Sequence, residues 1–539
     1  MPLPTGDQQW PPASLDGITD TLAAWSAWYE GTPEALRAAY GKDVARPRTR
    51  AAQYAGGVTG AVARWWWGRP TGDQASSRGQ LHVPIAADIA QASADLLFSE
   101  PPTLTASPGQ GGTGSESTRV QDRLDTLADD GLYATLAEAA EVGSALGGSY
   151  LRVTWDPAVA PAPFLTSVHA DGVVPEFRWG RLVAGTIWRR VYADERVVLR
   201  HLERHELDSN GTGVVLHGLY QGTPDRLGQV IPLTEHPATA GLATVVDANG
   251  AITTASPGLA LVYVPNQRPQ RRWRTHPLGV NLGRSDLDGV EPLMDALDET
   301  YSSWMRDLRL AKARLVVPDS MLTSHGLGGG TSFDLDREVF SPVHALVDPT
   351  SVGQSITPVQ FEIRVEQHAR TASELTEQIL RTAGYSAQTF GEGPDGAAIT
   401  ATEVHSRERR SFLTRDRKIR HWRPGTTDAV TKLLAVDAAL FAGPWRGEVV
   451  GVAFGDTVQD SPLASAQTAQ ALRTAQAAST KTLVQLTHPD WDEAAVLEEV
   501  AAIQAEQGLS VTDPGTFGRG GDGLALPTGL DGALLDTGR

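Results

Sequence analysis

The segment His201-Leu202-Glu203-Arg204-His205 carries the side chains best suited to metal chemistry in this sequence. Alternate residues of a β-strand share one face, so the two imidazoles and the Glu203 carboxylate would lie together. Their order differs from the His-Glu-x-x-His of metalloproteases, and a deaminase-type His-x-Glu needs a Pro-Cys-x-x-Cys partner. The chain has no cysteine, so it lacks that partner. A polar strand face is therefore favoured, and we predict no metal and no cofactor.

Motifs for nucleotide chemistry are also missing. No Gly-x4-Gly-Lys-Ser/Thr phosphate loop occurs, which argues against a packaging ATPase. The glycine-rich segment 518–523 lacks the flanking strand and helix of a dinucleotide fingerprint, and we assign it to a flexible tail. These observations predict a protein that is not an enzyme.

Composition sets the outer limits. The chain has 539 residues, of which 41% are hydrophobic and 20% are charged. This composition predicts a globular protein, and the length is enough for the hydrophobic cores of two to four domains. A net charge of −18 makes a poor static binder of nucleic acid but suits a surface that DNA slides past. The absence of cysteine suits a cytosolic or virion protein. We find no signal peptide and no apolar run long enough to span a membrane.

Hydrophobic periodicity divides the chain into helical and β-rich parts, which predicts an α+β fold class. The first hundred residues have helical spacing, and 124–145 is expected as one helix. From 147 the pattern alternates, as in an antiparallel meander. Strands are expected at 149–155, 164–169, 174–178, 182–191, 196–206, 213–220 and 259–264.

A long strut-like helix is expected from Asp286, with an apolar stripe along one face. Asp286 and neighbouring carboxylates would complement the N-terminal end of its dipole. Arg306, Arg309 and Lys312 would complement the C-terminal end. The stripe residues are Leu293, Leu297, Tyr301, Trp304 and Leu308.

A second helix, a loop and a basic helix follow. An extended entry at 357–358 leads into a helix to Ala383, and Gly384 is placed for a left-handed C-terminal residue. Glycine and proline make 385–398 a loop without helix or strand. A capping box at 400–403 then opens an arginine-rich helix, which Pro424-Gly425 should kink or break. A solvated helix face or ion pairs to a neighbouring acidic subunit are favoured over direct DNA contact for its arginines.

Several short motifs in this order resemble the portal proteins of long-tailed, siphovirus-type double-stranded DNA bacteriophages, especially those of actinobacterial and other Gram-positive hosts. The likeness covers roughly 54–443. The matching residues are Leu81-His82-Val83-Pro84, Ala94-Asp95-Leu96-Leu97-Phe98, Tyr263-Val264-Pro265-Asn266, Gly283-Arg284-Ser285-Asp286-Leu287 and Leu293-Met294-Asp295-Ala296-Leu297-Asp298-Glu299.

The resemblance implies a phage portal fold with a mainly helical wing, an antiparallel β-rich wing segment, a two-helix stem, a small clip, a tunnel loop and a helical crown. The implied boundaries are 1–285 for the wing with its β-rich part at 147–264, 286–317 and 358–384 for the stem helices, 318–357 for the clip, 385–398 for the tunnel loop, 399–443 for the wing's spine helix, 444–507 for the crown and 508–539 for a flexible C-terminal tail.

Function and partners follow from the same resemblance. It implies a homododecameric ring at one capsid vertex, through which the terminase packages double-stranded DNA and from which the DNA is later ejected. The ring would also be a platform for a head-tail adaptor and would contact the major capsid or scaffolding protein, without any membrane. The implied location is the virion, and the host cytoplasm during assembly.

The resemblance also assigns candidate site residues. The DNA-channel loop would present Gln388, Thr389, Phe390, Gly391 and Glu392. Arg306, Arg309 and Lys312 are candidate channel-lining positions of the stem, although dipole or inter-subunit pairing is the favoured role. Clip docking would involve Phe333, Asp334, Asp336 and Phe340, and the apolar stripe of the first stem helix would provide the stem packing.

Two alternatives stay open at this point. One is a DNA-packaging or DNA-processing enzyme such as a nuclease. The other is a non-portal head or tail assembly protein, which has no evident need for the order helix, excursion, helix, loop and basic helix.

Overall fold

A computed structural model shows a chain of mixed helix and sheet that divides into two compact units, Met1–Gly455 and Asp456–Arg539. Within the helices of the described residues, none is both long and apolar enough to cross a lipid bilayer. The described residues are 3–41, 81–109, 114–156, 159–310, 314–316, 323–324, 331–332, 357–359, 364–391, 401–455, 462–488, 491 and 493–506.

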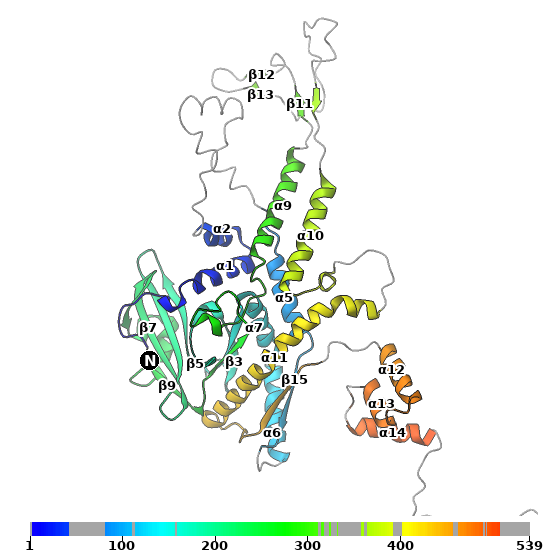
Figure 1. The fold of residues 1–539 in the computed structure, drawn as a ribbon. Coiled ribbons are helices and arrows are strands. Elements are labelled where there is room, and N and C mark those ends of the chain that lie inside the picture. The colour runs from blue at the N-terminus through cyan, green and yellow to red at the C-terminus, as the bar shows by residue number, and fades with distance from the viewer. Residues whose placement is uncertain are drawn as a thin grey trace, which may run out of the picture. The chain divides into compact units, whose positions relative to one another are not determined.

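The helices of the first unit follow the predicted apolar periodicity, with one break that the prediction missed. The expected helix at 124–145 is two helices, because Gly131 with φ 90° ends one and begins the next. The helices are α1 (Ile18–Glu30), α2 (Pro33–Gly41), α5 (Ile85–Phe98), α6 (Gly114–Asp129), α7 (Leu132–Leu146), α8 (Pro237–Ala240), α9 (Glu291–Leu310), α10 (Val365–Ala383) and α11 (Ala401–Leu440) (Figure 1).

The expected antiparallel strands are present, but they form two sheets rather than one meander. β2 (Gly148–Thr154) lies between β3 (Phe164–His169) and β10 (Leu261–Pro265). The larger sheet has the order β4-β5-β6-β7-β8, and β9 pairs with β7. Its strands are β4 (Val173–Arg178), β5 (Arg181–Ala193), β6 (Val198–Leu207), β7 (Thr212–Thr223), β8 (Arg226–Ile231) and β9 (Ala251–Pro257). Local alternation predicts a strand but not the strand with which it pairs, so the sequence did not predict the division into two sheets.

Other strand pairs link distant parts of the chain. β1 (Thr103–Ser107) pairs with β15 (Val449–Ala453), so the residues that follow α11 join the first unit. The boundary expected at 444 is therefore wrong, because the second unit begins at Asp456. The short pairs are β11 (Arg314–Val316) with β14 (Thr357–Val359) and β12 (Thr323–Ser324) with β13 (Thr331–Ser332).

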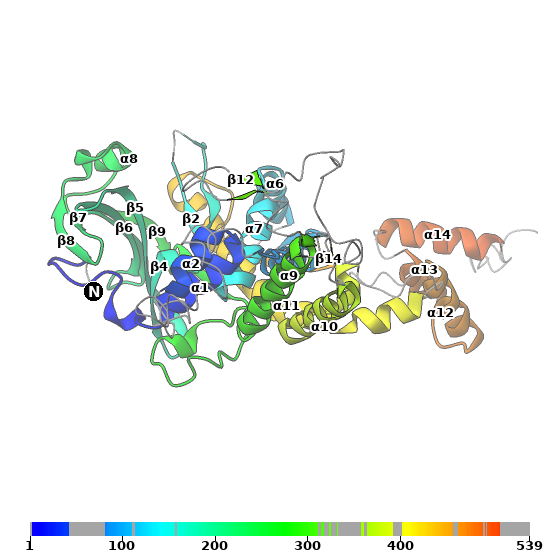
Figure 2. The same cartoon turned by 90° about the horizontal axis from the view of Figure 1, so that it is seen from above.

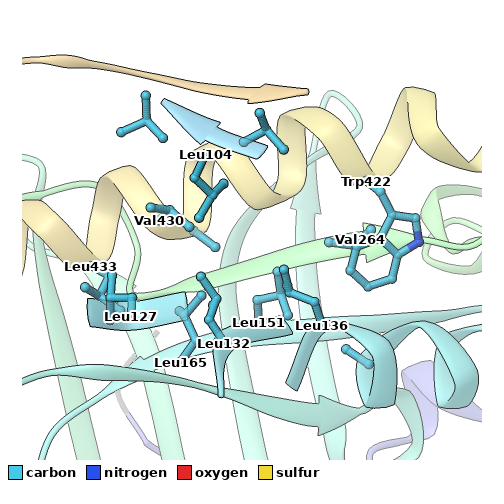
Figure 3. Packing of buried hydrophobic residues seen from close by; sticks show 14 of the residues in the cluster. Leu104, Leu127, Leu132, Leu136, Leu151, Leu165, Val264, Trp422, Val430 and Leu433 are labelled. Atoms are coloured by element: carbon cyan, nitrogen blue, oxygen red, sulfur yellow. The ribbon is translucent and has the colours of Figure 1, made fainter. Parts of the chain in front are cut away.

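Helix α11 runs without interruption from Ala401 to Leu440, although Pro424 lies inside it. The expected break is therefore wrong. Proline removes one helical hydrogen bond and costs about 3 kcal/mol, but core packing on both sides of Pro424 offsets this. Figure 3 shows Trp422 before the proline, and Val430 and Leu433 after it, facing the same core as Val264. Gly425 permits this approach, because a Cβ there would lie 2.7 Å from Val264 Cγ2.

The second unit is helical, as expected for its range. Its described helices are α12 (Pro462–Thr474), α13 (Thr480–Thr487) and α14 (Glu493–Glu506). Ser479 caps α13 by accepting a hydrogen bond from the Thr482 amide at 3.3 Å. The expected tail at 508–539 lies outside the described residues.

Candidate functional site: the helical arm and the turn beneath it

The His201–His205 motif lies on β6, as expected, and the face that carries its two histidines is buried. His201 and His205 are 3% and 1% exposed. The His201 ring stacks on His217 with an interplanar angle of 2°, and their nearest nitrogens are 3.2 Å apart. Glu203 accepts a hydrogen bond from Arg152 at 2.8 Å and contacts His205 Nε2 at 2.8 Å. Among described residues, no group of three or more histidine, aspartate or glutamate side chains is placed to hold a metal ion.

The buried histidines predict that acid destabilises the first unit. Burial and the adjacent His217 lower the pKa of His201 to about 4, whereas the unfolded chain takes up the proton near 6.5. The stabilisation is therefore complete above pH 6.5 and is lost as pH falls towards 4, by about 3 kcal/mol for His201. The urea midpoint should fall over this interval, and less steeply in His201→Gln. Equal slopes in the two proteins would contradict this assignment.

Helices α9 and α10 form an antiparallel pair, the helical arm (Figures 1 and 2). Leu297 of α9 and Ile379 of α10 are both fully buried in one cluster with Met294. Farther along the arm, Trp304 stacks on His368 with ring centroids 6.1 Å apart. His368 Nε2 lies 3.0 Å from Asp307 Oδ2, so aromatic and polar contacts join the helices beyond the apolar base.

The base of the arm is tied to the segment that precedes α5. The Val83 amide donates to Asp298 Oδ1 at 2.8 Å, and His82 Nδ1 lies 2.8 Å from Asp298 Oδ2. The Leu81 amide donates to Ser302 Oγ at 2.9 Å. Two of the motifs that suggested the family resemblance, 81–84 and 293–299, are therefore in direct contact.

The arm begins later than the sequence predicted. Helix α9 starts at Glu291 because Gly289, with φ 91°, precedes it, and Asp286 is buried in the body instead of completing a helix dipole. Asp288 and Glu291 both pair with Arg272, at 2.9 and 2.8 Å. The end expected at 317 is also too late, because α9 is assigned only to Leu310.

The expected apolar stripe changes from buried to exposed along the arm, and this sets the expected effect of truncating Trp304. Leu297 is fully buried, Leu293, Tyr301 and Trp304 are half-buried, and Leu308 is 39% exposed. A half-buried indole leaves a smaller cavity than a buried one. Trp304→Ala should therefore destabilise the protein by about 1–2 kcal/mol, and Leu297→Ala by about 2–5 kcal/mol, in urea unfolding. The reverse order would show that α9 packs differently.

Residues 384–391, the anchored turn, leave α10 and dock on α11. Gly384 has φ 104°, and its amide donates to the Leu380 carbonyl at 3.0 Å, as the glycine prediction required. Thr414 Oγ1 of α11 donates to the Gly384 carbonyl at 2.7 Å. The Ser386 amide donates to Ser411 Oγ at 3.0 Å, and Thr389 Oγ1 lies 2.8 Å from that same hydroxyl.

The anchored turn corrects the prediction of a loop without helix. Residues Ala387–Phe390 form a 3-10 helix. Phe390 packs edge-on against Tyr385, with ring centroids 6.2 Å apart. Gln388, Thr389 and Phe390 are half-buried, because α11 and the base of the arm supply partners that glycine-rich composition does not reveal.

A buried ion pair between Asp286 and Lys418 lies under the anchored turn. The Lys418 ammonium donates to Asp286 Oδ2, to Ser93 Oγ at 2.5 Å and to the Tyr385 hydroxyl at 2.9 Å. The two charged side chains are 0% and 1% exposed. The pair thus joins α11, α5, the anchored turn and the segment that precedes α9.

Asp286 has partners on both carboxylate oxygens. Oδ2 also accepts from the hydroxyls of Ser144 at 2.6 Å and Tyr385 at 2.7 Å. Oδ1 accepts from the amides of Asn266 at 2.9 Å and Gln267 at 2.7 Å. A buried carboxylate needs such partners to stay ionised.

The electrostatics of the pair follow from burial and contact. Burial acts to raise the pKa of Asp286, but the charge and hydrogen bonds of Lys418, Ser144 and Tyr385 hold that pKa below its usual range. Burial lowers the pKa of Lys418, and Asp286 opposes the shift. Burial and the Asp286 charge raise the pKa of the Tyr385 phenol well above its usual range, so it stays a donor at neutral pH.

The other predicted site residues are less well placed. Gly391 ends the anchored turn, and Glu392 lies outside the described residues. Arg306 is exposed on α9, and Arg309 belongs to the same helix. Lys312 and the clip residues Phe333, Asp334, Asp336 and Phe340 also lie outside the described residues.

Sequence reasoning missed Lys418 and Tyr385, and it misplaced Asp286. Lys418 lies in the helix expected after 400–403, where the sequence predicts no separate role for it, and Asp286 is predicted as a helix-end charge. One local signal existed, because Lys418 is four residues before Trp422 and shares its helix face. No local sequence pattern indicated that the Asp286 carboxylate, which precedes α9, would contact Lys418.

A family model described as "Phage portal protein, SPP1 Gp6-like" matches residues 223–510, which is more than half of the chain. The chain belongs to this family of phage portal proteins. The matched region contains the arm, the anchored turn, all of α11 and the described helices of the second unit of the portal protein.

Other comparisons add little to this assignment. No curated protein matches the portal protein. A solved structure titled "Neck of native GTA particle computed with C12 symmetry" is similar at 12% identity and a TM-score of 0.35, over 75% of this chain and 89% of that one. A TM-score this low supports no conclusion about the chain.

Proposed function

We propose that this portal protein assembles into a dodecameric ring at one capsid vertex, through which a terminase packages double-stranded DNA and from which the DNA later leaves. The family match over 223–510 is the observation that carries this proposal. The match favours a portal over a nuclease because the portal family is structural. It favours a portal over a generic scaffold because the matched family is one of portal proteins. The order of arm, anchored turn and basic helix agrees with it.

The parts of the ring are assigned as follows. The arm of α9 and α10 serves as the stem, 318–357 as the clip, and α11 as the spine of the wing. The crown comprises the helices of the second unit, from Asp456. We further propose a siphovirus-type phage of a Gram-positive host, with a head-tail adaptor and the major capsid or scaffolding protein as further partners. The protein would occupy the host cytoplasm before it enters the virion.

The anchored turn divides the proposed tunnel loop into a fixed and a working part. Thr389 and Phe390 have hydrogen-bond and aromatic partners, so we assign them to fixing the loop on the body. Contact with passing DNA then falls to Gln388 and to the residues from Gly391 to Ala398. The carboxylates Glu392 and Asp395 would disfavour gripping by ion pairs, which suits a surface that DNA must slide past.

Deletion of 392–396 tests this function without removing the fixed part. We expect rings in negative-stain images and wild-type thermal stability, together with a loss of packaged or retained DNA in phage particles. Thr389→Val is the matched comparison, since it keeps the loop length and removes one hydrogen bond. Wild-type packaging by the deletion would exclude this segment as the constriction. The absence of rings from the unaltered protein would contradict the portal assembly itself.

A further inference from the structure

The hairpin that joins β4 to β5 has an unusual tip. Arg178 pairs with Arg181 across the two strands, which leaves Trp179 and Gly180 as a two-residue turn. Both turn residues have positive φ, 51° and 79°, as in a type I′ turn. Asparagine or aspartate followed by glycine is the usual solution, and a bulky aromatic residue at positive φ is strained.

Each feature of this tip works against local stability. The Trp179 side chain is 97% exposed, so its indole has no packing to offset the strained backbone. Arg178 and Arg181 place like charges opposite each other, which destabilises a strand pair. Residues that break local rules are expected at functional or strained sites.

The hairpin tip adjoins the loop between β10 and α9. A Cβ added to Gly180 would lie 3.9 Å from Asn281 Oδ1. The Arg268 guanidinium of that loop donates to the Asn281 carbonyl oxygen. Arg271 of the same loop is exposed.

The same loop is joined to α11 through Asp286. The Asn266 amide nitrogen donates to the Arg284 carbonyl at 3.0 Å, and Asn266 also binds Asp286, the partner of Lys418. Burial and the nearby guanidinium of Arg271 lower the pKa of Arg284, and Arg417 of α11 acts in the same direction. Burial, Arg268 and Arg420 lower the pKa of His421.

We group Trp179, Arg181, Arg268, Arg271, Arg417 and Arg420 as the tryptophan–arginine face. The hairpin tip and Arg268 meet at Asn281, the charges of Arg268 and Arg420 both act on His421, and those of Arg271 and Arg417 both act on Arg284. All six side chains are exposed, and Asp416 interrupts the positive charge on α11. None of the salt bridges between described residues involves Arg268, Arg271, Arg417 or Arg420. Tryptophan and arginine are the residues most enriched at the energetic centres of protein interfaces.

We propose that the tryptophan–arginine face binds an acidic surface of a second copy of this chain. Charge complementarity supports this occupant, because each copy of the chain carries a net charge of −18 while this face is basic. The inference rests on the proposed ring, in which each subunit meets a neighbour through a head-to-tail contact. It goes further by naming the residues of one side of that contact.

Trp179→Asn separates binding from folding. Asparagine suits a type I′ turn better than tryptophan, so the variant subunit should be at least as stable as the original in thermal unfolding of unassembled protein. We expect the concentration at which half of the chains are in rings to rise at least tenfold in sedimentation velocity. A ring population equal to that of the unaltered protein would overturn the proposal.

A charge-reversal pair supplies the second test. R271E/R417E/R420E should abolish rings at moderate salt, whereas R119E/R196E/R473E makes the same change in net charge at exposed positions elsewhere and should keep them. Equal assembly of the two triple variants would overturn the proposal. The proposal would also be overturned if R271E/R417E/R420E formed normal rings but lost affinity for a DNA duplex in fluorescence anisotropy, because the face would then bind nucleic acid. If the unaltered protein forms no ring, the proposed function itself fails.

Discussion

Replacing Lys418 with methionine should destabilise the protein by about 3–5 kcal/mol, the usual effect of removing one partner from a buried ion pair. The Asp286 carboxylate would remain fully buried and lose its only cationic contact among the described residues. Methionine keeps the length and apolar stem of the side chain, so the loss reports the charge more than the packing. Urea unfolding at matched protein concentration measures it.

The pH dependence of this loss identifies its cause. Without Lys418 the pKa of Asp286 should rise, so lowering the pH until this carboxylate is protonated should relieve part of the destabilisation. Arg423→Met, at an exposed position of the same helix, is the control and should change stability by less than about 0.5 kcal/mol. A pH-independent loss in Lys418→Met would point to altered packing instead.

Lys418→Met should also loosen the anchored turn. Lys418 donates to the Tyr385 hydroxyl, and Tyr385 donates to Asp286, so the variant removes one side of this triangle. Hydrogen exchange of the amides of Gly384 and Tyr385 should accelerate more than exchange in β6, which lies in a separate sheet. Uniform acceleration across the first unit would mean global destabilisation only.

Trp422→Ala should destabilise the protein by a similar amount, about 3–5 kcal/mol. The indole is 2% exposed and packs edge-on against Phe98, with ring centroids 5.1 Å apart. Figure 3 shows it beside Val264, and in the sequence of α11 it lies shortly before Pro424. Its loss would leave a cavity and weaken the packing that keeps α11 continuous through the proline.

Leu413→Ala provides the comparison for Trp422→Ala. Leu413 is also on α11 but is 47% exposed, so its truncation should change the urea midpoint little. Phe98→Ala combined with Trp422→Ala tests the contact itself, since the double variant should lose less than the sum of the single variants. Additive losses would show that the two rings contribute independently.

The sequence by itself determined the kinds of element and much of their order. Apolar spacing located α5, α7 and α10, alternation located β2 to β7, and Gly384 marked the end of α10. These signals succeed because they depend on residues close in sequence, whose spacing decides which face of a helix or strand is apolar. The motifs at 81–84 and 293–299 also suggested the correct family, and they lie in contact.

Only the tertiary structure decided how charged and strained residues are used. The sequence alone predicts Asp286 as a helix-end carboxylate, yet its partners come from α7, the loop after β10, the anchored turn and α11. The sequence alone predicts that Pro424 breaks its helix, but core contacts on both sides keep α11 intact. Trp179 carried no local signal of exposure. Burial sets the free energy of a charge, a proline or an indole, and burial depends on segments far away in the sequence.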